Sequence, residues 1–239
     1  MNIIKYPSRS EWPAIVSRPH IDLSQLQDSV HHILADVRQQ GDEAIRRYEQ
    51  QFDHVALTSL KVTAEEISAA VDAVDAELKE AMKVAYGNIR RFHESQRHAL
   101  LHVETCTGVE CWQKSVAIES VGLYIPGGTA PLFSTVLMLA IPAQLAGCSE
   151  VVLCSPPDKD GRIHPAILTA ARLCGVRQIF KAGGVQAIGA MAYGTESVPK
   201  VSKIFGPGNR YVMAAKQQVS MQDVAIDMPA GPSEVCVIA

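Results

Sequence analysis

The spacing of hydrophobic residues changes near residue 120 of this 239-residue chain. In residues 22–98, apolar positions recur every three or four residues, which is the period of an amphipathic helix. From residue 120 onward, short apolar runs typical of buried strands alternate with helical segments. The pattern therefore predicts a mainly helical first part and, over residues 120–233, a parallel α/β sheet with helices on both faces.

Local signals refine the first part. Asp42 follows a glycine that ends one helical run and is placed to cap the next helix. Thr63 and Glu66 have the spacing of a capping box. Residues 1–21, which contain three prolines, predict an N-terminal arm with one brief helix, and residues 100–119 predict a hairpin.

The second part contains five expected strands and four expected helices. The strands are expected at residues 121–125, 151–154, 178–180, 203–205 and 225–227, and the helices near residues 134–146, 165–174, 185–193 and 210–219. Because crossovers between parallel strands are right-handed, the carboxyl ends of all these strands should lie at one edge of the sheet.

Turns rich in glycine and proline collect at that edge, where open α/β sheets bind ligands. They are PGG at residues 126–128, GGVQ at 183–186, GPGN at 206–209 and MPAGPS at 228–233. Four such turns at one edge predict a ligand site. Gly127, Gly184 and Gly208 should leave room for close backbone approach.

Tyr124, Gln186 and Asn209 end or follow three different strands, so the topology should bring them together. A tyrosine ring can pack on a base or sugar, and amides can bond ribose or phosphate oxygens, which suits a dinucleotide. The alternative is that all three only cap turns. No G-x-G-x-x-G fingerprint follows a strand, so the predicted fold is Rossmann-like without the usual phosphate loop. Asp158 could be the acid that holds a ribose, but Ser155-Pro156-Pro157 before it favours a plain loop.

Composition excludes several classes of protein. The hydrophobic fraction is 47%, and the formal net charge is −3. The pI of about 6.2 gives no indication of nucleic-acid or membrane-surface binding. The sequence shows neither a signal peptide nor a long apolar run, so we expect a cytoplasmic protein with reduced thiols.

Candidate metal ligands are sparse. Cys106 and Cys111 lie near His98 and His102, but compact zinc sites usually have tighter pairs, so a bland hairpin is favoured over a zinc site. No other metal cluster is evident in the sequence.

Candidate nucleophiles and bases are also few. Cys148 or Cys154 could act as a nucleophile, although burial is favoured because only His164 is near in sequence. Lys181 and Lys203 lie at strand ends, facing either the ligand edge or solvent. The residues alone therefore show binding turns but no acid–base pair.

Long motifs identify a resemblance. SVGLYIPGGTAPLFSTVLMLAIPAQLAGC, VVLCSPP, GTESVPKVSKIFGPGN, AIDMPAGPSEV, RQQGDEAIRRYEQQFD and LKVTAEEISAA resemble histidinol dehydrogenases over essentially the whole chain. The resemblance implies NAD-dependent oxidation of L-histidinol, through L-histidinal, to L-histidine. It also implies a zinc ion and a homodimer.

The resemblance further implies roles for individual residues. Tyr124, Gln186 and Asn209 match NAD contacts, and Ser233 matches a substrate contact. The catalytic Glu–His pair and the zinc ligands of the family are expected downstream of Ala239. Residues 22–119 match the first half of a discontinuous domain, and residues 234–239 match the start of the return to it. Because the sequence stops within an apolar run, we expect an incomplete chain.

Three hypotheses follow. The chain is the amino-terminal part of a histidinol dehydrogenase, or a fragment that only binds nucleotide, or a related aldehyde dehydrogenase with a cysteine nucleophile. The third requires Cys148 or Cys154 to be exposed at the ligand edge.

Overall fold

The structure is a computed structural model that describes residues 3–17, 24–97, 99–128 and 130–228. In the described N-terminal arm, one short helix, α1 (Trp12–Ile15), has no buried residue. The helical part contains α2 (Ser24–Gln40), α3 (Asp42–Tyr48), the π-helical turn η1 (Glu49–Asp53), α4 (Ala64–Ala73) and α5 (Ala76–Glu94). These elements confirm the mainly helical character predicted for residues 22–98.

The sheet part alternates strands and helices as predicted. Its elements are β3 (Ser120–Tyr124), α6 (Phe133–Ala146), β4 (Glu150–Ser155), α7 (Pro165–Leu173), β5 (Gln178–Lys181), α8 (Gly184–Tyr193), β6 (Lys203–Phe205), α9 (Arg210–Ser220) and β7 (Ala225–Ile226). All five strands are parallel, in the order β5-β4-β3-β6-β7. The chain runs outward from β3 to β5 and then returns to the other side of β3. The direction of winding therefore reverses between β3 and β6, and ligands bind at this kind of crevice in doubly wound folds.

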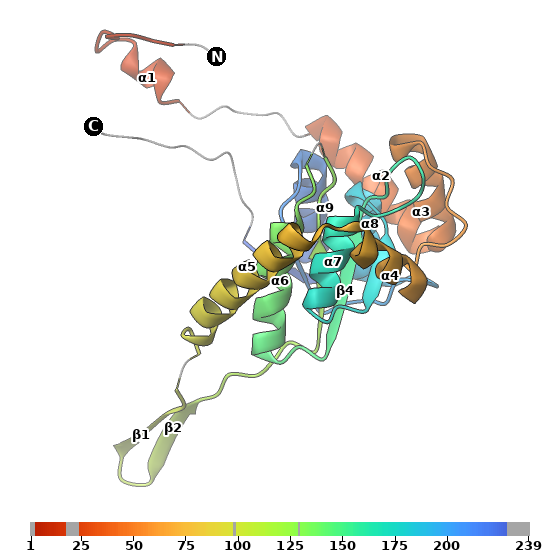
Figure 1. Cartoon of the computed structure of the whole chain (residues 1–239). Coiled ribbons are helices and arrows are strands. Elements are labelled where there is room, and N and C mark those ends of the chain that lie inside the picture. Colours follow the sequence, from red (N-terminus) through yellow and green to blue (C-terminus); the bar gives the residue numbers. More distant parts are fainter. Residues whose placement is uncertain (1–2, 18–23, 98, 129, 229–239) are drawn as a thin grey trace.

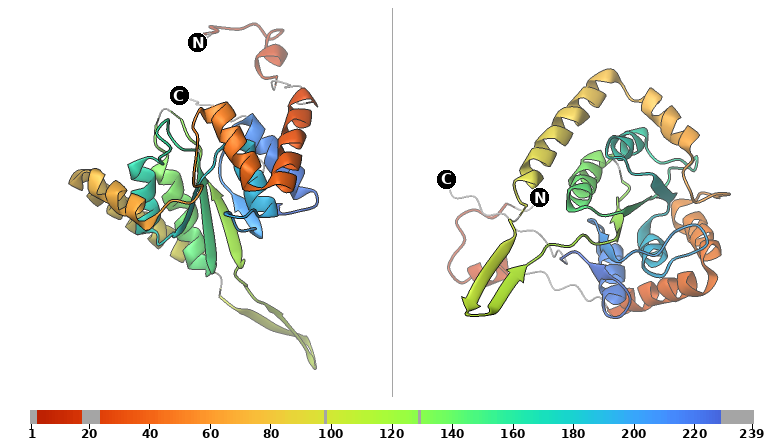
Figure 2. Two further views of the ribbon diagram at one scale, coloured as in Figure 1. Left: turned by 90° about the vertical axis from the view of Figure 1, so that its right-hand side faces the viewer. Right: turned by 90° about the horizontal axis from the view of Figure 1, so that it is seen from below.

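Helices cover both faces of the sheet (Figures 1 and 2). On one face, α2, α3, α8 and α9 share a hydrophobic core with strand residues such as Val152 and Ile204. On the other, α6 and α7 pack with α4 and α5 around residues such as Leu123 and Ile179. Helices of the first part thus complete both cores of the sheet.

Capping explains several helix boundaries. The capping box forms: the Thr63 hydroxyl accepts from Glu66 N, and the Glu66 carboxylate accepts from Thr63 N. The expected cap at Asp42 is wrong, because Gly41 is the N-cap and Asp42 is the first helical residue. The Asp42 carboxylate instead accepts bonds from Thr195 and Ser197. It therefore joins α3 to the loop after α8.

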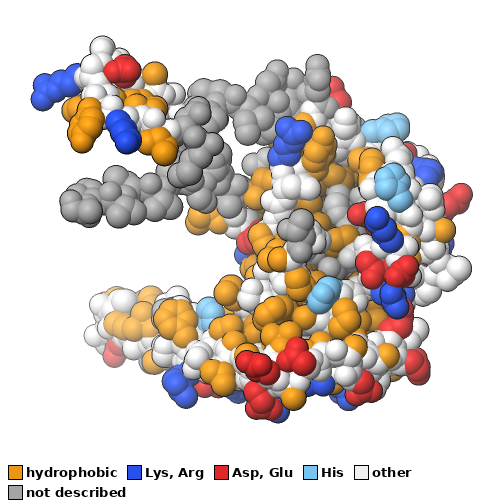
Figure 3. Space-filling view, turned by 45° about the horizontal axis from the view of Figure 1, so that its top comes forward, with side chains coloured by type: hydrophobic (Ala, Val, Ile, Leu, Met, Phe, Trp, Pro, Cys, Tyr) orange, Lys and Arg blue, Asp and Glu red, His pale blue; other side chains and the backbone are white. Residues whose placement is uncertain are grey.

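Residues 100–119 contain the predicted hairpin. Strands β1 (Leu101–Cys106) and β2 (Val109–Gln113) are antiparallel, and their turn includes Gly108 at φ 81°. Every residue of both strands is exposed. The hairpin projects from the body, and hydrophobic side chains gather on this arm (Figure 3). None of the helices in the described ranges is both long and apolar enough to cross a bilayer.

Candidate functional site

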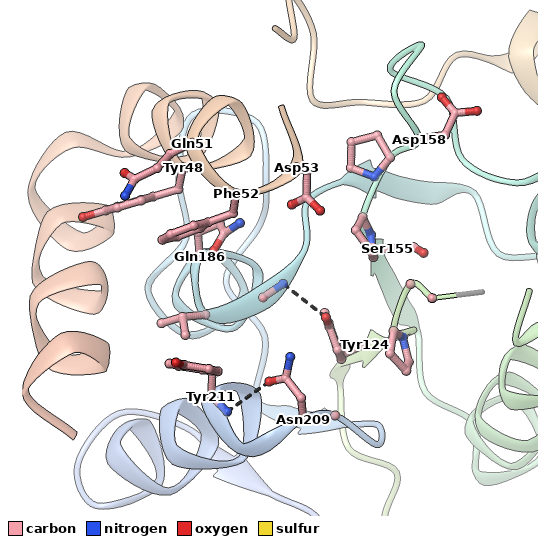
Figure 4. A pocket seen from close by; sticks show the side chains of 18 of the residues that line it. Tyr48, Gln51, Phe52, Asp53, Tyr124, Ser155, Asp158, Gln186, Asn209 and Tyr211 are labelled. Carbon is pink, nitrogen blue, oxygen red and sulfur yellow. Dashed lines mark hydrogen bonds between the residues drawn. The ribbon is translucent and has the colours of Figure 1, made fainter. Parts of the chain in front are cut away.

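A cleft of about 1460 Å³ opens at the carboxyl edge of the sheet, beside the reversal point between β3 and β6. It exceeds the roughly 300–1,000 Å³ of a typical small-molecule pocket. Its lining comes from α2, α3 and η1 on one side and from the turns after β3, β4, β5 and β6 on the other. Tyr124, Gln186 and Asn209 all line it, so the structure brings the three predicted residues together (Figure 4).

Tyr124 ties the central strand to the start of α8. Its hydroxyl accepts a hydrogen bond from Gly184 N at 3.1 Å, and the residue is only 3% exposed. Burial raises the pKa of Tyr124 to about 12. The side chain is therefore a neutral phenol near pH 7, and protein covers nearly all of it.

Gln186 lies in the first turn of α8 and is 1% exposed. Its Nε2 donates to Glu49 Oε1 at 2.9 Å, which fixes the side-chain amide. Its Oε1 is buried and has no hydrogen-bond partner among the described residues, and Ser155 Oγ in the same cleft wall is in the same state. Buried polar atoms without a hydrogen-bond partner are uncommon in proteins, and a bound ligand can supply the missing partner.

Asn209 combines a structural role with exposure to the cleft. Its Oδ1 accepts from Tyr211 N at 3.0 Å and Val212 N at 3.1 Å, and thus caps α9. The Nδ2 atom is on the other side of the amide and points into the cleft (Figure 4). The sequence left open the alternative that Asn209 only caps a turn. Capping uses its Oδ1, and its Nδ2 remains available to donate to a ligand.

Two acidic residues of η1, Glu49 and Asp53, were not predicted from the sequence. Asp53 lines the cleft, and Glu49 is buried behind the cleft wall. Glu49 is completely buried, and its Oε1 accepts from Gly183 N at 2.8 Å as well as from Gln186. Burial is the main cause that raises the pKa of Glu49, to about 7, and the nearby Asp53 carboxyl adds to it. Burial also raises the pKa of Asp53. Short π-helical turns such as η1 are frequent at functional sites.

An aromatic and charged surface continues this wall. The Tyr48 and Phe52 rings stack with centroids 5.6 Å apart. The Tyr48 hydroxyl donates to Asp36 at 2.6 Å, Arg47 donates to the same carboxylate at 2.7 Å, and these bonds hold the pKa of Asp36 below its usual range. A flat apolar face such as that of Phe52, which is 48% exposed, is suited to stacking with a planar ring.

At Gly127, Gly184 and Gly208, which were expected to leave room for contact between a ligand and the backbone, protein atoms lie close to the position of an added Cβ. A Cβ on Gly127 would lie 2.6 Å from Pro156 Cγ, and one on Gly208 would lie 2.3 Å from Val212 Cγ1. Gly184 has φ +52°, in the region that favours glycine. Gly128 differs, because a Cβ there would meet none of the described residues beyond its chain neighbours within 4 Å.

Comparison with known proteins gives the family. A profile described as "Histidinol dehydrogenase" matches residues 16–239. The chain belongs to the histidinol dehydrogenase family. It is 64% identical over 239 residues to a histidinol dehydrogenase of Bacteroides thetaiotaomicron, covering all of this chain and 56% of that protein. It is 57% identical over 228 residues to that of Escherichia coli K12, covering 94% and 52%.

A solved structure agrees. The crystal structure of histidinol dehydrogenase from Elizabethkingia anophelis superposes with a TM-score of 0.90 at 52% identity, over 95% of this chain and 52% of that one. The chain therefore spans about half the length of these histidinol dehydrogenases.

Several candidate residues do not contribute chemistry to the cleft. Asp158 lines it, but its Oδ1 accepts from Asp160 N and Arg162 N at 2.9 Å each, which favours the loop interpretation. Lys181 is largely buried and pairs with Glu66 at 2.5 Å. Lys203 begins β6, at the opposite edge of the sheet, and packs on a phenylalanine ring. Neither lysine lines the cleft.

The structure contradicts the hypothesis of a cysteine nucleophile. Cys154 is fully buried, and Cys148 precedes β4, at the edge opposite the cleft. Burial raises the pKa of both thiols, which disfavours the reactive thiolate.

Metal ligands do not cluster in the described part of the chain: no group of three or more His, Cys, Asp or Glu side chains is placed to hold an ion. Cys106 and Cys111 are exposed on the hairpin, and His102 contacts Glu110 at 3.2 Å. His98 lies outside the described residues, as do Ser233 and residues 234–239. The substrate contact matched by Ser233 stays a prediction, as does the division into domains.

Proposed function

We propose that this chain forms the nucleotide-binding part of an NAD-dependent histidinol dehydrogenase, which oxidises L-histidinol through L-histidinal to L-histidine. The family match over residues 16–239, joined to the convergence of Tyr124, Gln186 and Asn209 at one cleft, carries the proposal. The function is thus that of an oxidoreductase in histidine biosynthesis.

The cleft wall suits NAD. Asn209 Nδ2 is placed to donate to a ribose or phosphate oxygen, and Gln186 Oε1 and Ser155 Oγ are buried polar atoms without protein partners in the described structure. Phe52 offers an apolar face for a base or nicotinamide ring, and the open backbone at Gly128 permits close approach. When bound, NAD would accept the hydride; this part of the chain would bind and orient it.

Zinc fits the described residues poorly, because they contain no cluster of ligands. No step of the reaction is therefore assigned to a metal, and no catalytic residue is assigned within residues 3–228. Ser233 is proposed as a substrate contact from its family position alone.

We also propose a cytoplasmic homodimer. The exposed apolar side chains on the hairpin support an assembly, because soluble proteins rarely leave such patches uncovered. Leu101, Val103, Val109 and Trp112 are 45–66% exposed. Light scattering after gel filtration would test the mass of the assembly.

Calorimetric titration of the chain with NAD tests the central proposal, and an assay of NADH formation with L-histidinol tests turnover. Saturable NAD binding is expected. Binding without turnover would favour the alternative of a nucleotide-binding module. If NAD does not bind at any concentration tested, the proposed nucleotide site is wrong.

A further inference from the structure

The turn that follows β6 begins at Gly206, in close contact with the end of β3. Gly206 has φ +136°, and a Cβ at this position would overlap the carbonyl oxygen of Tyr124. The next three residues, 207–209, line the cleft, whereas Gly206 itself does not. The placement of Gly206 therefore sets where Asn209 can lie relative to Tyr124.

Two charged side chains bind both backbone polar groups of Gly206. Its N–H donates to Asp227 Oδ2 at 2.9 Å, and its carbonyl oxygen accepts from Lys216 Nζ at 2.8 Å. Lys216 Nζ also donates to Asp227 Oδ1. The three residues thus form a closed ring of hydrogen bonds, which joins the residue after β6, the residue after β7 and the middle of α9.

The ion pair within this ring is buried at its cationic end. Lys216 is 1% exposed, whereas the Asp227 side chain is 29% exposed. A buried ammonium is costly unless its charge is paired and its N–H groups are bonded, and apolar side chains of similar volume are often neutral or stabilising in place of a buried ion pair. Filling this space therefore does not require a lysine, but bonding the Gly206 carbonyl oxygen requires a donor.

The other end of the same turn is also bound to α9. Asn209 Oδ1 accepts from the N–H groups of Tyr211 and Val212 in the first turn of that helix. Lys216 lies on the same helix, about two turns beyond Asn209. Residues 206–209 are thus attached to α9 at both ends, with Asn209 Nδ2 directed into the cleft (Figure 4).

We propose that Lys216 and Asp227 are positioning residues, which hold the turn at residues 206–209 so that Asn209 Nδ2 can donate to bound NAD. Neither residue lines the cleft, so both act through the turn and not by contact with the ligand. The inference rests on the proposed function. Loss of the pair should weaken NAD binding even where the fold is retained.

The test compares NAD binding and thermal stability in two variants of the pair. Lys216→Met leaves the Asp227 charge unpaired, whereas Lys216→Met/Asp227→Asn removes both charges and should melt closer to the unmodified protein. Both variants lack the donor to the Gly206 carbonyl oxygen. In calorimetric titrations, both should raise the dissociation constant for NAD at least about fivefold, roughly the effect of one hydrogen bond.

The pair of Lys181 and Glu66 provides a matched control. Lys181 is also a buried lysine in an ion pair, and neither residue lines the cleft. Lys181→Met/Glu66→Gln removes both charges, and glutamine can still serve in the capping box with Thr63. The dissociation constant for NAD should stay within about twofold of the original in this control.

A second comparison asks whether the pair acts through Asn209. Asn209→Ser keeps an oxygen that can cap α9 but has no Nδ2 donor. In this background, adding Lys216→Met/Asp227→Asn should weaken binding by less than about twofold further, because residues that act through one contact are not additive. Equal losses in the two backgrounds would show that the pair does not act through Asn209, and would overturn the inference.

Two other results would overturn it. One is an unchanged dissociation constant in Lys216→Met/Asp227→Asn, and the other is a double variant that no longer folds, because the pair would then be required by the fold itself. If the unmodified protein does not bind NAD, the proposed function fails, and the positioning is measured without ligand by nuclear magnetic resonance. The side-chain amide resonances of Asn209 should then shift in the double variant but not in the control, and unshifted resonances would show that the pair does not position Asn209.

Discussion

Substitution of Asn209 separates helix capping from ligand binding, because the two roles belong to different atoms of one amide. Oδ1 caps α9 through two backbone N–H groups, whereas Nδ2 points into the cleft. Asn209→Ala removes both atoms. Asn209→Asp keeps the capping oxygen and replaces the donor with a second acidic oxygen.

The expected magnitudes differ for the two variants. Loss of an N-cap costs about 0.5–2 kcal/mol of stability, so Asn209→Ala should lower the melting temperature by roughly 2–4 °C per kcal/mol lost. Aspartate is as good an N-cap as asparagine, and its negative charge is favourable at a helix N-terminus. The melting temperature of Asn209→Asp should therefore equal or slightly exceed that of the unmodified protein. Both should weaken NAD binding by roughly 1–3 kcal/mol, or about 5- to 150-fold, because a hydrogen bond to the ligand is lost.

Calorimetric titration with NAD and a thermal melt of the same samples give both quantities. Asn209→Ser serves as a matched control that keeps a capping oxygen without adding charge, and it should bind weakly while melting nearly normally. If Asn209→Asp and Asn209→Ser bind NAD like the unmodified protein while Asn209→Ala only melts earlier, Asn209 is a structural cap and its assignment to the site is wrong.

Three further predictions concern stability and reactivity. Because the pKa of Glu49 is raised, the folded state binds its proton more tightly than the unfolded chain does, and the free energy of unfolding should fall by up to about 3 kcal/mol from about pH 4.5 to about pH 7. In urea titrations, Glu49→Gln should reduce this dependence of the free energy of unfolding on pH. The same pH dependence in Glu49→Gln as in the unmodified protein would contradict the prediction. Lys216→Met should cost at least about 2 kcal/mol in the same assay, because the buried ammonium bonds Gly206 O and Asp227; a loss below about 0.5 kcal/mol would show that the pair is dispensable. Thiol reagents should label the exposed Cys106 and Cys111 of the folded protein before the buried Cys154, as read by mass spectrometry, and early labelling of Cys154 would show that its strand opens.

The sheet and its edge could be predicted because their signals are local. Apolar runs bounded by glycine and proline give strand positions, and the right-handed crossover places their ends together without any knowledge of side-chain contacts. Tyr124, Gln186 and Asn209 therefore converge as expected. The order of the strands, and with it the reversal between β3 and β6, became visible only in the structure, since spacing along the chain does not specify which strands are neighbours.

The opposite wall of the cleft could not be predicted in this way. Glu49 and Asp53 lie in a polar segment, EQQFD, whose composition resembles an ordinary solvated helix end. Burial is the main cause of the raised pKa of Glu49, and the nearby Asp53 carboxyl adds to it. The hydrogen bond that Glu49 accepts from Gly183 N spans 134 residues of sequence. The one available signal was the i, i+4 pair of Tyr48 and Phe52, which places two aromatic rings on one helical face.

The cleft joins the two parts that the hydrophobic pattern separates. Residues of α2, α3 and η1 supply one wall, and the turns after β3, β4, β5 and β6 supply the other. The same helices bury Val30, Leu34 and Ile45 in the core beneath the sheet, so the wall is fixed by apolar packing before any ligand binds. Glu49, buried behind that wall, accepts hydrogen bonds from Gly183 N and Gln186 Nε2, and these bonds are a polar link between the wall and the turn that begins α8. The change in hydrophobic periodicity near residue 120 thus marks a change in local structure. The site, in contrast, depends on contacts between the parts of the chain before and after that residue.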